Sequence, residues 1–193
     1  MTRIIAGAAG GRRIAAPEGR ATRPTSDRVR EALFASVLSA LGTLAGLRVL
    51  DLYAGSGAIG LEALSRGAAH ALLVEADRRA AAVIRRNIAR TGLAGARLVV
   101  DRVERVLARG AEDGPYDLVV ADPPYSVGDD QVAAVLAALR DHGWLADDAL
   151  VVVERSSRGD AFRWPDGYLE GKARQYGETS LWYGHAASLP GPS

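Results

Sequence analysis

Short apolar runs alternate with amphipathic stretches along most of the chain after residue 46. The apolar runs are nearly continuous and rich in Val and Leu, as in strands that are buried on both faces of a parallel sheet. The stretches between them repeat apolar residues every three or four positions, as in helices that cover such a sheet. We therefore predict an α/β protein with a doubly wound, mostly parallel sheet. The predicted strands are 47–52, 71–74, 97–100, 116–121 and 149–154, and the predicted helices between them are 59–65, 78–91, 103–109 and 131–142.

The chain before this alternating region has a different character. Residues 1–24 are rich in Gly, Pro and Arg, and they predict an extended basic arm or a small β-hairpin rather than a helix. A helix is predicted to follow, because Ser26 or Asp27 can accept hydrogen bonds from the free N–H groups of its first turn. Its apolar positions recur at spacings of four, and it is expected to end near Gly42.

Two segments near the other end of the chain, 169–174 and 179–183, favour an antiparallel pair that would close the sheet. The last residues, 186–193, predict a frayed tail. A length of 193 residues suits one domain with a sizeable core. The predicted organisation is therefore a basic arm at 1–24, one α/β domain at 25–185 and a tail at 186–193.

Composition excludes some classes of protein. The chain has no Cys, so it cannot form a disulfide or a Cys-based metal site. Its three His residues are far apart in sequence, which argues against a zinc site. No apolar run approaches the ~18 residues of a membrane span, and the first residues do not resemble a signal peptide. We expect a monomeric, cytoplasmic protein without a membrane anchor or a metal.

Charge is distributed unevenly, although the net charge is only +1. Residues 1–30 contain seven Arg and two acidic residues, a balance of +5, so the rest of the chain has a net charge of −4. A preference for Arg over Lys explains why these cations are Arg, but not why they gather in the first thirty positions. The asymmetry indicates contact with a polyanion at one end of the molecule. The candidate contact residues are Arg3, Arg12, Arg13, Arg23, Arg28 and Arg30.

The first motif with chemical meaning, V-L-D-L-Y-A-G-S-G-A-I-G at 49–60, joins a predicted strand to a predicted helix. The spacing of Gly55, Gly57 and Gly60 lets the backbone approach a nucleotide-like ligand, and NAD-dependent enzymes use the same spacing. Asp51 favours a different ligand, since a carboxylate would repel pyrophosphate and attract the cationic amino acid portion of S-adenosylmethionine. A turn that only packs the strand on the helix is the structural alternative.

Acidic residues also end the next two predicted strands. Glu75 lies about 20 positions beyond the first glycine of the loop, where doubly wound folds bind a ribose through a carboxylate. Its alternative role is to cap the following helix, although Asp77 fits that role better. Asp101, at the end of the third strand, could accept a hydrogen bond from an adenine amino group or could be a solvated turn residue.

The fourth predicted strand runs directly into D-P-P-Y at 122–125. Two successive prolines lack N–H donors and fix φ near about −65°, so the chain leaves the sheet along a stiff path. The Asp122 carboxylate and the Pro123 carbonyl could then accept hydrogen bonds from one planar NH₂ group, while Tyr125 offers a ring for base stacking. A Pro-Pro turn alone is common, but at the end of the fourth strand, after the glycine loop, it indicates amine methylation.

These motifs together resemble the class I methyltransferases with a [DNS]-P-P-[YFW] motif for amine targets, and within them the RsmD family. R-I-I-A-G (3–7), G-R-R-I (11–14) and R-P-T-S-D-R-V-R-E-A-L-F (23–34) are similar to the arm and first helix of that family. D-L-Y-A-G-S-G-A-I-G-L-E-A (51–63) and D-P-P-Y are similar to its core, and Y-G-E-T (176–179) to its C-terminal end. The resemblance covers nearly the whole chain.

The resemblance implies a Rossmann-like fold, S-adenosylmethionine as cofactor, and methylation of a guanine N2 amine in 16S ribosomal RNA, free or within an assembling small subunit. It also implies that the basic arm contacts RNA phosphates. The implied catalytic residues are Asp122, Pro123, Pro124 and Tyr125. The implied cofactor-binding residues are Asp51, Tyr53, Ala54, Gly55, Gly57, Glu75, Ala76, Asp101, Arg102 and Val103.

Three other interpretations remain open at this point. A DNA methyltransferase acting on adenine N6 or cytosine N4 would use the same D-P-P-Y chemistry, although the chain lacks an obvious target-recognition domain. An NAD-dependent oxidoreductase would need residues for hydride transfer, and the sequence shows none. A non-catalytic RNA-binding assembly factor would keep the arm and the fold without methyl transfer.

Overall fold

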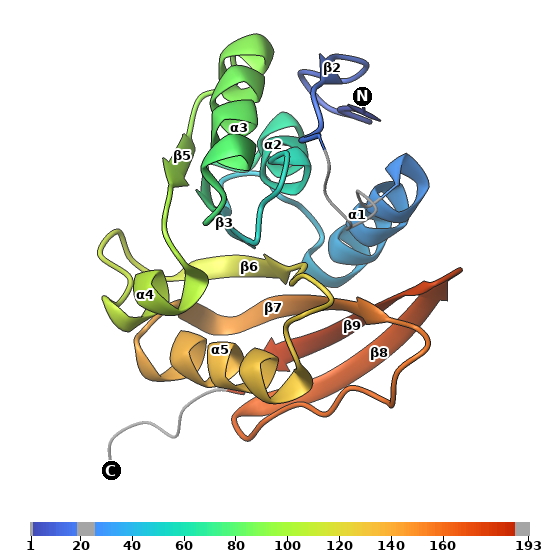
Figure 1. Ribbon diagram of the computed structural model, residues 1–193, viewed down its shortest axis with the longest axis vertical. Helices are drawn as coiled ribbons and strands as arrows, with labels where there is room; N and C mark the ends of the chain where they lie inside the picture. The colour runs from blue at the N-terminus through green and yellow to red at the C-terminus, as the bar shows by residue number, and fades with distance from the viewer. Residues whose placement is uncertain (1, 19–25, 188–193) are drawn as a thin grey trace.

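A computed structural model describes residues 2–18 and 26–187 of the chain. In these ranges, seven strands form one sheet in the order β5-β4-β3-β6-β7-β9-β8, and five helices cover it (Figure 1). The strands are β3 (Arg48–Leu52), β4 (His70–Val74), β5 (Ala96–Val99), β6 (Tyr116–Ala121), β7 (Leu145–Ser156), β8 (Tyr168–Tyr176) and β9 (Thr179–Ala186). The helices are α1 (Asp27–Leu41), α2 (Ala58–Ser65), α3 (Arg78–Thr91), α4 (Val103–Ala108) and α5 (Asp129–Asp141), and a hairpin of β1 (Thr2–Arg3) and β2 (Arg13–Ile14) precedes them.

The strands β3 to β7 run parallel to one another, whereas β9 pairs antiparallel with both β7 and β8. The predicted doubly wound sheet with an antiparallel C-terminal pair is therefore confirmed. The chain moves outward from β3 through β4 to β5, and then returns to β6 on the other side of β3. This reversal between β3 and β6 marks the place where open α/β sheets bind their ligands.

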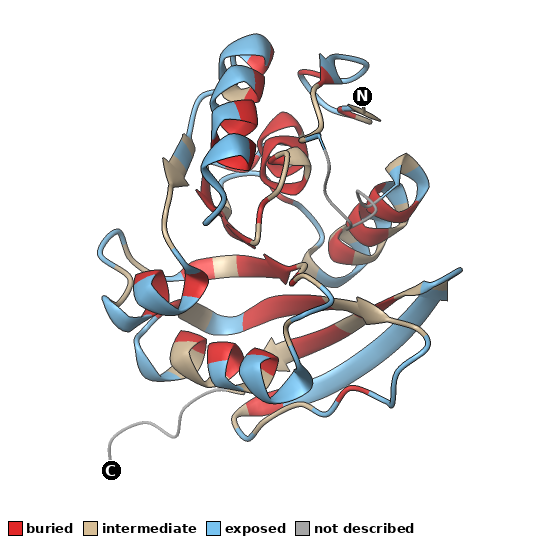
Figure 2. Cartoon of the chain, viewed as in Figure 1, coloured by how far each residue is buried: buried red, intermediate tan, exposed pale blue. Residues whose placement is uncertain are grey.

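The sheet is the middle one of three layers. On one face α1, α2 and α3 contribute core residues such as Phe34, Leu61 and Ile84. On the other face α4 and α5 contribute Leu107 and Leu136. Figure 2 shows buried residues along the central strands and on the sides of the helices that face them. Among the described helices, none combines the length and the hydrophobicity that a membrane span requires.

Local hydrogen bonds explain where the helices begin and end. Ser26 caps α1, and its hydroxyl accepts a first-turn backbone N–H at 3.2 Å, as the sequence predicts. Asp77 caps α3 by accepting from the N–H groups of Arg79 and Ala80 at 2.7 and 3.3 Å. After α3, Gly92 adopts a left-handed φ of 63°, which favours glycine. The predicted limits of α3 and of β6 match the structure.

The last three strands of the sheet are longer than predicted, and the difference is largest at β7. The apolar pattern predicts a strand over 149–154, whereas β7 spans Leu145–Ser156. Its first half contains two aspartates, which interrupt the apolar run, and its register with β6 shifts between Tyr116 and Leu118. Pairing with β6 on one side and β9 on the other extends the strand beyond its locally hydrophobic part.

The N-terminal hairpin is part of the helical layer that contains α1, α2 and α3 (Figure 1). Ile4 and Ile14 are fully buried in the core of that layer. Gly7, with φ of 82°, comes so close to α2 that a Cβ would lie 1.8 Å from the Ser65 carbonyl oxygen. Any other residue at position 7 would therefore push the hairpin away from α2.

The C-terminal prediction needs one correction. The sequence predicts a tail from residue 186, but Ala186 is the last residue of β9 and is buried. It pairs with Tyr168 at the start of β8, so tertiary pairing orders a position that local sequence leaves open. Residues 188–193 lie outside the described ranges.

Candidate active site

The carboxyl ends of β3, β4, β5 and β6 lie at one edge of the sheet, because these strands are parallel. Backbone hydrogen bonds connect the residues that follow them. The N–H of Ala54 donates to the end of β4 at 2.9 Å, that of Glu75 to the end of β5 at 3.1 Å, and that of Asp122 to the end of β3 at 3.4 Å. The structure thus brings the glycine loop, Glu75, Asp101 and D-P-P-Y to the same edge.

The glycine loop turns sharply between β3 and α2. Gly55 and Gly57 have φ of 62° and 79°, values that other residues rarely adopt. A Cβ at Gly57 would lie 2.9 Å from a methyl carbon of Leu73, so the loop packs directly on β4. Tyr53 has φ of 60° although it is not a glycine, and strain of this kind is found most often at functional sites. The loop presents backbone groups close to the acidic residues of this edge.

Asp51 is the buried acidic residue of β3, with only 2% of its surface exposed. Its Oδ2 accepts a hydrogen bond from the Gly60 N–H at 2.9 Å, which ties the strand to α2. Burial, with a smaller contribution from the charge of Glu75, raises the pKa of Asp51 to about 8. Within the described ranges it forms no ion pair. A ligand cation placed beside Asp51 would therefore favour its ionised form.

Glu75, directly after β4, is also 2% exposed. Its two carboxylate oxygens accept hydrogen bonds from the N–H groups of Gly55, at 2.8 Å, and Asp77, at 2.9 Å. The first of these bonds holds the glycine loop against the end of β4. Asp77 caps α3, as the sequence predicts, and Glu75 does not. Among the described residues, no group of three or more His, Cys, Asp or Glu side chains is placed to hold a metal ion.

Asp101 follows β5 and is already engaged by several donors. It accepts from the Arg102 N–H at 2.8 Å, forms a close ion pair with Arg109 and lies 3.8 Å from the Arg105 guanidinium. The Arg102 hydrogen bond and then the arginine charges lower the pKa of the Asp101 carboxyl. Val103 is buried as the first residue of α4, whereas Arg102 is exposed. An adenine amino group would have to share the Asp101 carboxylate with Arg109.

D-P-P-Y leaves β6 at the same edge. Asp122 and Pro124 are half-buried, Pro123 is buried, and Tyr125 is 60% exposed. The exposed ring is available for stacking on a planar partner. The turn that follows is closed by a hydrogen bond from the Val127 N–H to the Pro124 carbonyl at 2.9 Å. The motif therefore combines a stiff backbone with one polar and one aromatic side chain at its two ends.

Two further residues hold this site together, and the sequence motifs do not include them. Arg155 on β7 donates to the Val127 carbonyl at 3.0 Å and pairs with Asp129 at 2.7 Å, so it anchors the turn after D-P-P-Y. Asn87 on α3 is buried and donates to the Ser56 carbonyl of the glycine loop at 2.8 Å. Neither residue has a signal in the sequence, because both act on segments that are distant along the chain.

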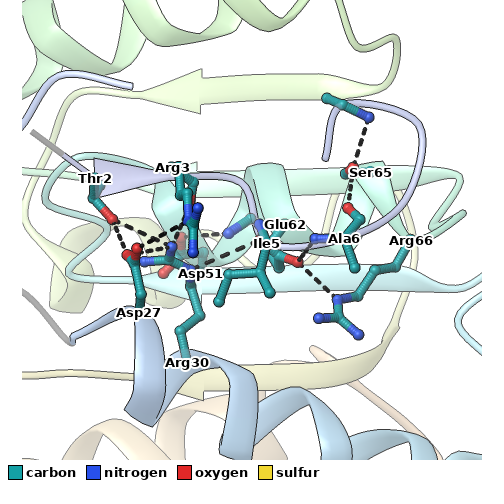
Figure 3. A network of polar contacts seen from close by, with 12 residues as sticks. Thr2, Arg3, Ile5, Ala6, Asp27, Arg30, Asp51, Glu62, Ser65 and Arg66 are labelled. Atoms are coloured by element: carbon teal, nitrogen blue, oxygen red, sulfur yellow. Dashed lines mark hydrogen bonds and ion pairs between the residues drawn. The ribbon is translucent and has the colours of Figure 1, made fainter. Parts of the chain in front are cut away.

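The candidate RNA-binding arginines do not form one equivalent set. The prediction that Arg30 contacts RNA is wrong, because its side chain is only 1% exposed. Its guanidinium binds Asp27 at 3.1 Å and lies 3.8 Å from Glu62 (Figure 3). Buried in this ion-pair network, it is not available to a phosphate. Arg3 is exposed but pairs with Asp27 at 3.5 Å. Arg12, Arg13 and Arg28 are exposed, and Arg23 lies outside the described residues.

The fold and the residues at this edge define an S-adenosylmethionine-dependent methyltransferase of the Rossmann-like class. The chain belongs to the family described as conserved hypothetical protein 95, which matches residues 2–185. It is similar to ribosomal RNA small subunit methyltransferase D of Escherichia coli strain K12, with 41% identity over 152 residues, 79% of this chain and 73% of that protein. The protein of the same name from Haemophilus influenzae is 31% identical over 154 residues, 79% of this chain and 77% of its own.

A solved structure gives the same result. The Escherichia coli protein yhhF superposes with a TM-score of 0.83 at 34% identity, over 97% of this chain and 99% of that one. The predicted membership of the RsmD family is therefore confirmed, and so is the predicted enzyme class. An NAD-dependent oxidoreductase is excluded by the same findings.

Proposed function

We propose that this enzyme transfers the methyl group of S-adenosylmethionine to the exocyclic N2 amine of a guanine in 16S ribosomal RNA. One observation carries the proposal: D-P-P-Y lies at the same sheet edge as the glycine loop, Asp51 and Glu75. The similarity of the chain to small-subunit ribosomal RNA methyltransferases supports the same proposal. The substrate follows from the site chemistry and the relatives together.

The residues of this edge fit S-adenosylmethionine better than a dinucleotide. Asp51 and Glu75 are both acidic and buried, so they disfavour a phosphate and favour ammonium and hydroxyl groups. The Tyr53 hydroxyl is buried and has no hydrogen-bond partner among the described residues, which leaves it free for a ligand. When bound, the cofactor supplies an electrophilic methyl group on a positively charged sulfur. The proposed binding residues are Asp51, Tyr53, Ala54, Gly55, Gly57, Glu75, Ala76, Asp101, Arg102 and Val103.

The residues of D-P-P-Y would orient the target amine. The N2 lone pair of guanine is delocalised into the ring, so the amine is a poor nucleophile until its geometry changes. Hydrogen bonds to the Asp122 carboxylate and the Pro123 carbonyl would hold the nitrogen in place and stabilise the positive charge that develops on it. Pro124 would keep the backbone stiff, and Tyr125 would stack on a guanine that has left its helix.

The basic N-terminal region would hold the rest of the RNA. Arg3, Arg12, Arg13 and Arg28 are exposed on the hairpin and at the start of α1, and they would contact phosphates without reading sequence. Arg23 is proposed to do the same, whereas Arg30 is not, because it is buried. We also propose that the enzyme acts as a monomer in the cytoplasm.

Cofactor binding should release a proton at pH 7. In the free protein the pKa of Asp51 is about 8, so most molecules carry a protonated carboxyl at that pH. A ligand ammonium group favours the carboxylate, and the affinity should therefore rise with pH, by up to about tenfold per unit, between pH 6 and 7.5. Calorimetry in two buffers of different ionisation heat measures the proton count. The Asp51→Asn variant should bind S-adenosylmethionine more weakly and release no proton, whereas Asp101→Asn should still release the proton. A wild-type proton count of zero would contradict the assignment of Asp51 to the ligand ammonium group.

Mass mapping of the product tests the proposed function directly. Ribosomal RNA lacking the modification, from a strain without the gene, would be incubated with the protein and S-adenosylmethionine. We expect one methylated guanine in 16S RNA, modified at N2. Free RNA and partly assembled small subunits, compared in the same assay, identify the preferred substrate. Methylation of adenine N6 in DNA, or none in any of these substrates, would overturn the proposal.

A further inference from the structure

Arginines without ion pairs gather on α3 and the adjoining hairpin. α3 contains five arginines and no acidic residue, and all five are exposed on the outer side of the helix (Figure 2). None of them pairs with a carboxylate among residues 2–18 and 26–187, and neither do Arg12 and Arg13. The five are Arg78, Arg79, Arg85, Arg86 and Arg90.

Most other exposed arginines have an acidic partner. Arg97 pairs with Asp113 beside β5, and Arg158 pairs with Glu178 near β9. Outside residues 1–30 and α3, the chain has nine more acidic than basic side chains. The excess positive charge of the protein is therefore confined to the N-terminal region and this one helix.

The helix arranges its arginines in two rows. Residues seven positions apart lie almost on one line, because two turns of an α-helix take about 7.2 residues. The rows run along the helix, which is about 20 Å long, and small exposed residues separate them. One row is Arg79, Arg86 and Arg90, the other is Arg78 and Arg85, and Ala82 and Ala89 lie between them.

This arrangement does not favour the stability of the helix. Arg78 and Arg79 begin α3, where the positive end of the helix dipole disfavours cations. Arg86 and Arg90 are four positions apart, a spacing at which like charges repel. By contrast, α5 begins with two aspartates, as stability would favour, whereas both helices have one arginine in the last turn. The arginines of α3 therefore indicate binding of an anion rather than a role in folding.

The hairpin extends the rows. The Arg12 guanidinium donates to the Thr91 carbonyl at the end of α3. Ala15 and Asn87 exchange two hydrogen bonds of 2.9 Å, so the chain after β2 lies along the helix. α3 begins shortly after Glu75, which directly follows β4. A continuous basic strip thus leads from the hairpin along α3 to the edge where the active site lies.

We propose that the outer face of α3, together with Arg12 and Arg13, is the main docking surface for the RNA backbone. This inference rests on the proposed function, since it assigns the surface to the RNA substrate. Guanidinium groups bind phosphates with paired hydrogen bonds, and a row of them matches a row of phosphates without reading bases. The strip positions the RNA, and D-P-P-Y selects the amine.

A triple variant tests the surface: Arg79→Gln, Arg86→Gln and Arg90→Gln. We expect its affinity for a 16S RNA transcript to fall at least about tenfold at 0.15 M salt, and the slope of log Kd against log salt to decrease by about 2. KM for RNA should rise while kcat at saturating RNA and the Kd for S-adenosylmethionine stay unchanged. The melting temperature should not fall, because the substitutions relieve repulsion between exposed arginines.

The control variant removes the same charge elsewhere: Arg97→Gln, Arg158→Gln and Arg174→Gln, all at exposed positions. We expect it to bind RNA with the wild-type affinity and salt slope. Wild-type RNA affinity and slope in the α3 variant, or equal losses in both variants, would overturn the docking surface. Neither result would contradict the proposed function, which is contradicted only if the wild-type enzyme does not methylate the RNA.

Discussion

Asp122→Ala is expected to lower kcat for methyl transfer by about 10³-fold or more, while the Kd values for RNA and S-adenosylmethionine remain close to wild type. The carboxylate would accept a hydrogen bond from the amine and stabilise the charge that develops on nitrogen as it is methylated. Both effects are larger in the transition state than in the bound substrate, so the loss falls on kcat rather than on binding. Single-turnover transfer of a labelled methyl group to 16S RNA, with binding measured separately, checks this.

Three further variants separate the roles of the Asp122 and Tyr125 side chains. Asp122→Asn keeps an acceptor oxygen without the charge and should retain part of the lost activity. Tyr125→Phe keeps a stacking ring and should be nearly as active as wild type, whereas Tyr125→Ala should raise KM for RNA. Asp130→Ala, an exposed position at the start of α5, is the matched control and should change nothing. An unchanged rate of methyl transfer by Asp122→Ala would show that the assignment of the active site to D-P-P-Y is wrong.

Glu62→Ala is expected to lower the free energy of unfolding by about 3–5 kcal/mol. Glu62 is completely buried on α2, and its carboxylate pairs with Arg66 at 2.8 Å and lies 3.8 Å from the Arg30 guanidinium (Figure 3). It also accepts from the N–H groups of Ile5 and Ala6 at 2.8 and 3.0 Å, which fastens the hairpin to α2. Its removal takes one of two carboxylates away from the buried Arg30 guanidinium and leaves the two backbone donors without their acceptor. Urea unfolding measures the loss.

Two comparisons separate the charge from the hydrogen bonds. Glu62→Gln keeps an acceptor for the hairpin but removes the charge beside Arg30. Its free energy of unfolding should therefore fall less than that of Glu62→Ala. Glu31→Ala changes an exposed residue on α1 and should stay within about 0.5 kcal/mol of wild type. A loss below about 1 kcal/mol for Glu62→Ala would mean that the network does not hold the hairpin.

The same network explains why Arg30 could not be assigned from sequence. Its position in a basic segment indicates an exposed cation, like Arg28 two residues earlier. In the structure the two side chains differ completely, because α1 turns Arg30 toward Glu62 and leaves Arg28 in solvent. One acidic partner, Asp27, is local, but the buried partner Glu62 lies on another helix, about thirty positions away in sequence, and no local pattern reveals that burial.

The sequence predicts the bounds of α3 correctly, but not the burial of each of its positions. Of its small and polar residues, Ala82 is exposed, whereas Ala81 and Asn87 are buried. Alanine fits either side of a helix at little cost, so its identity says little about burial. A buried Asn is even less expected, and it is stable here only because Ala15 and Ser56 satisfy its amide.

By itself the sequence determined the order of strands and helices, the caps of α1 and α3, the chemistry at four strand ends and, through resemblance, the family. These features are short-range, because apolar periodicity, capping side chains and stiff prolines act within a few residues. Only the tertiary structure decided the burial of Arg30 and Glu62, the anchoring roles of Asn87 and Arg155, and the joining of the hairpin to α3 into one basic strip. Each of these depends on contacts between residues far apart along the chain. Burial and ion pairing together determine whether a charged side chain stabilises the fold or remains available to bind RNA.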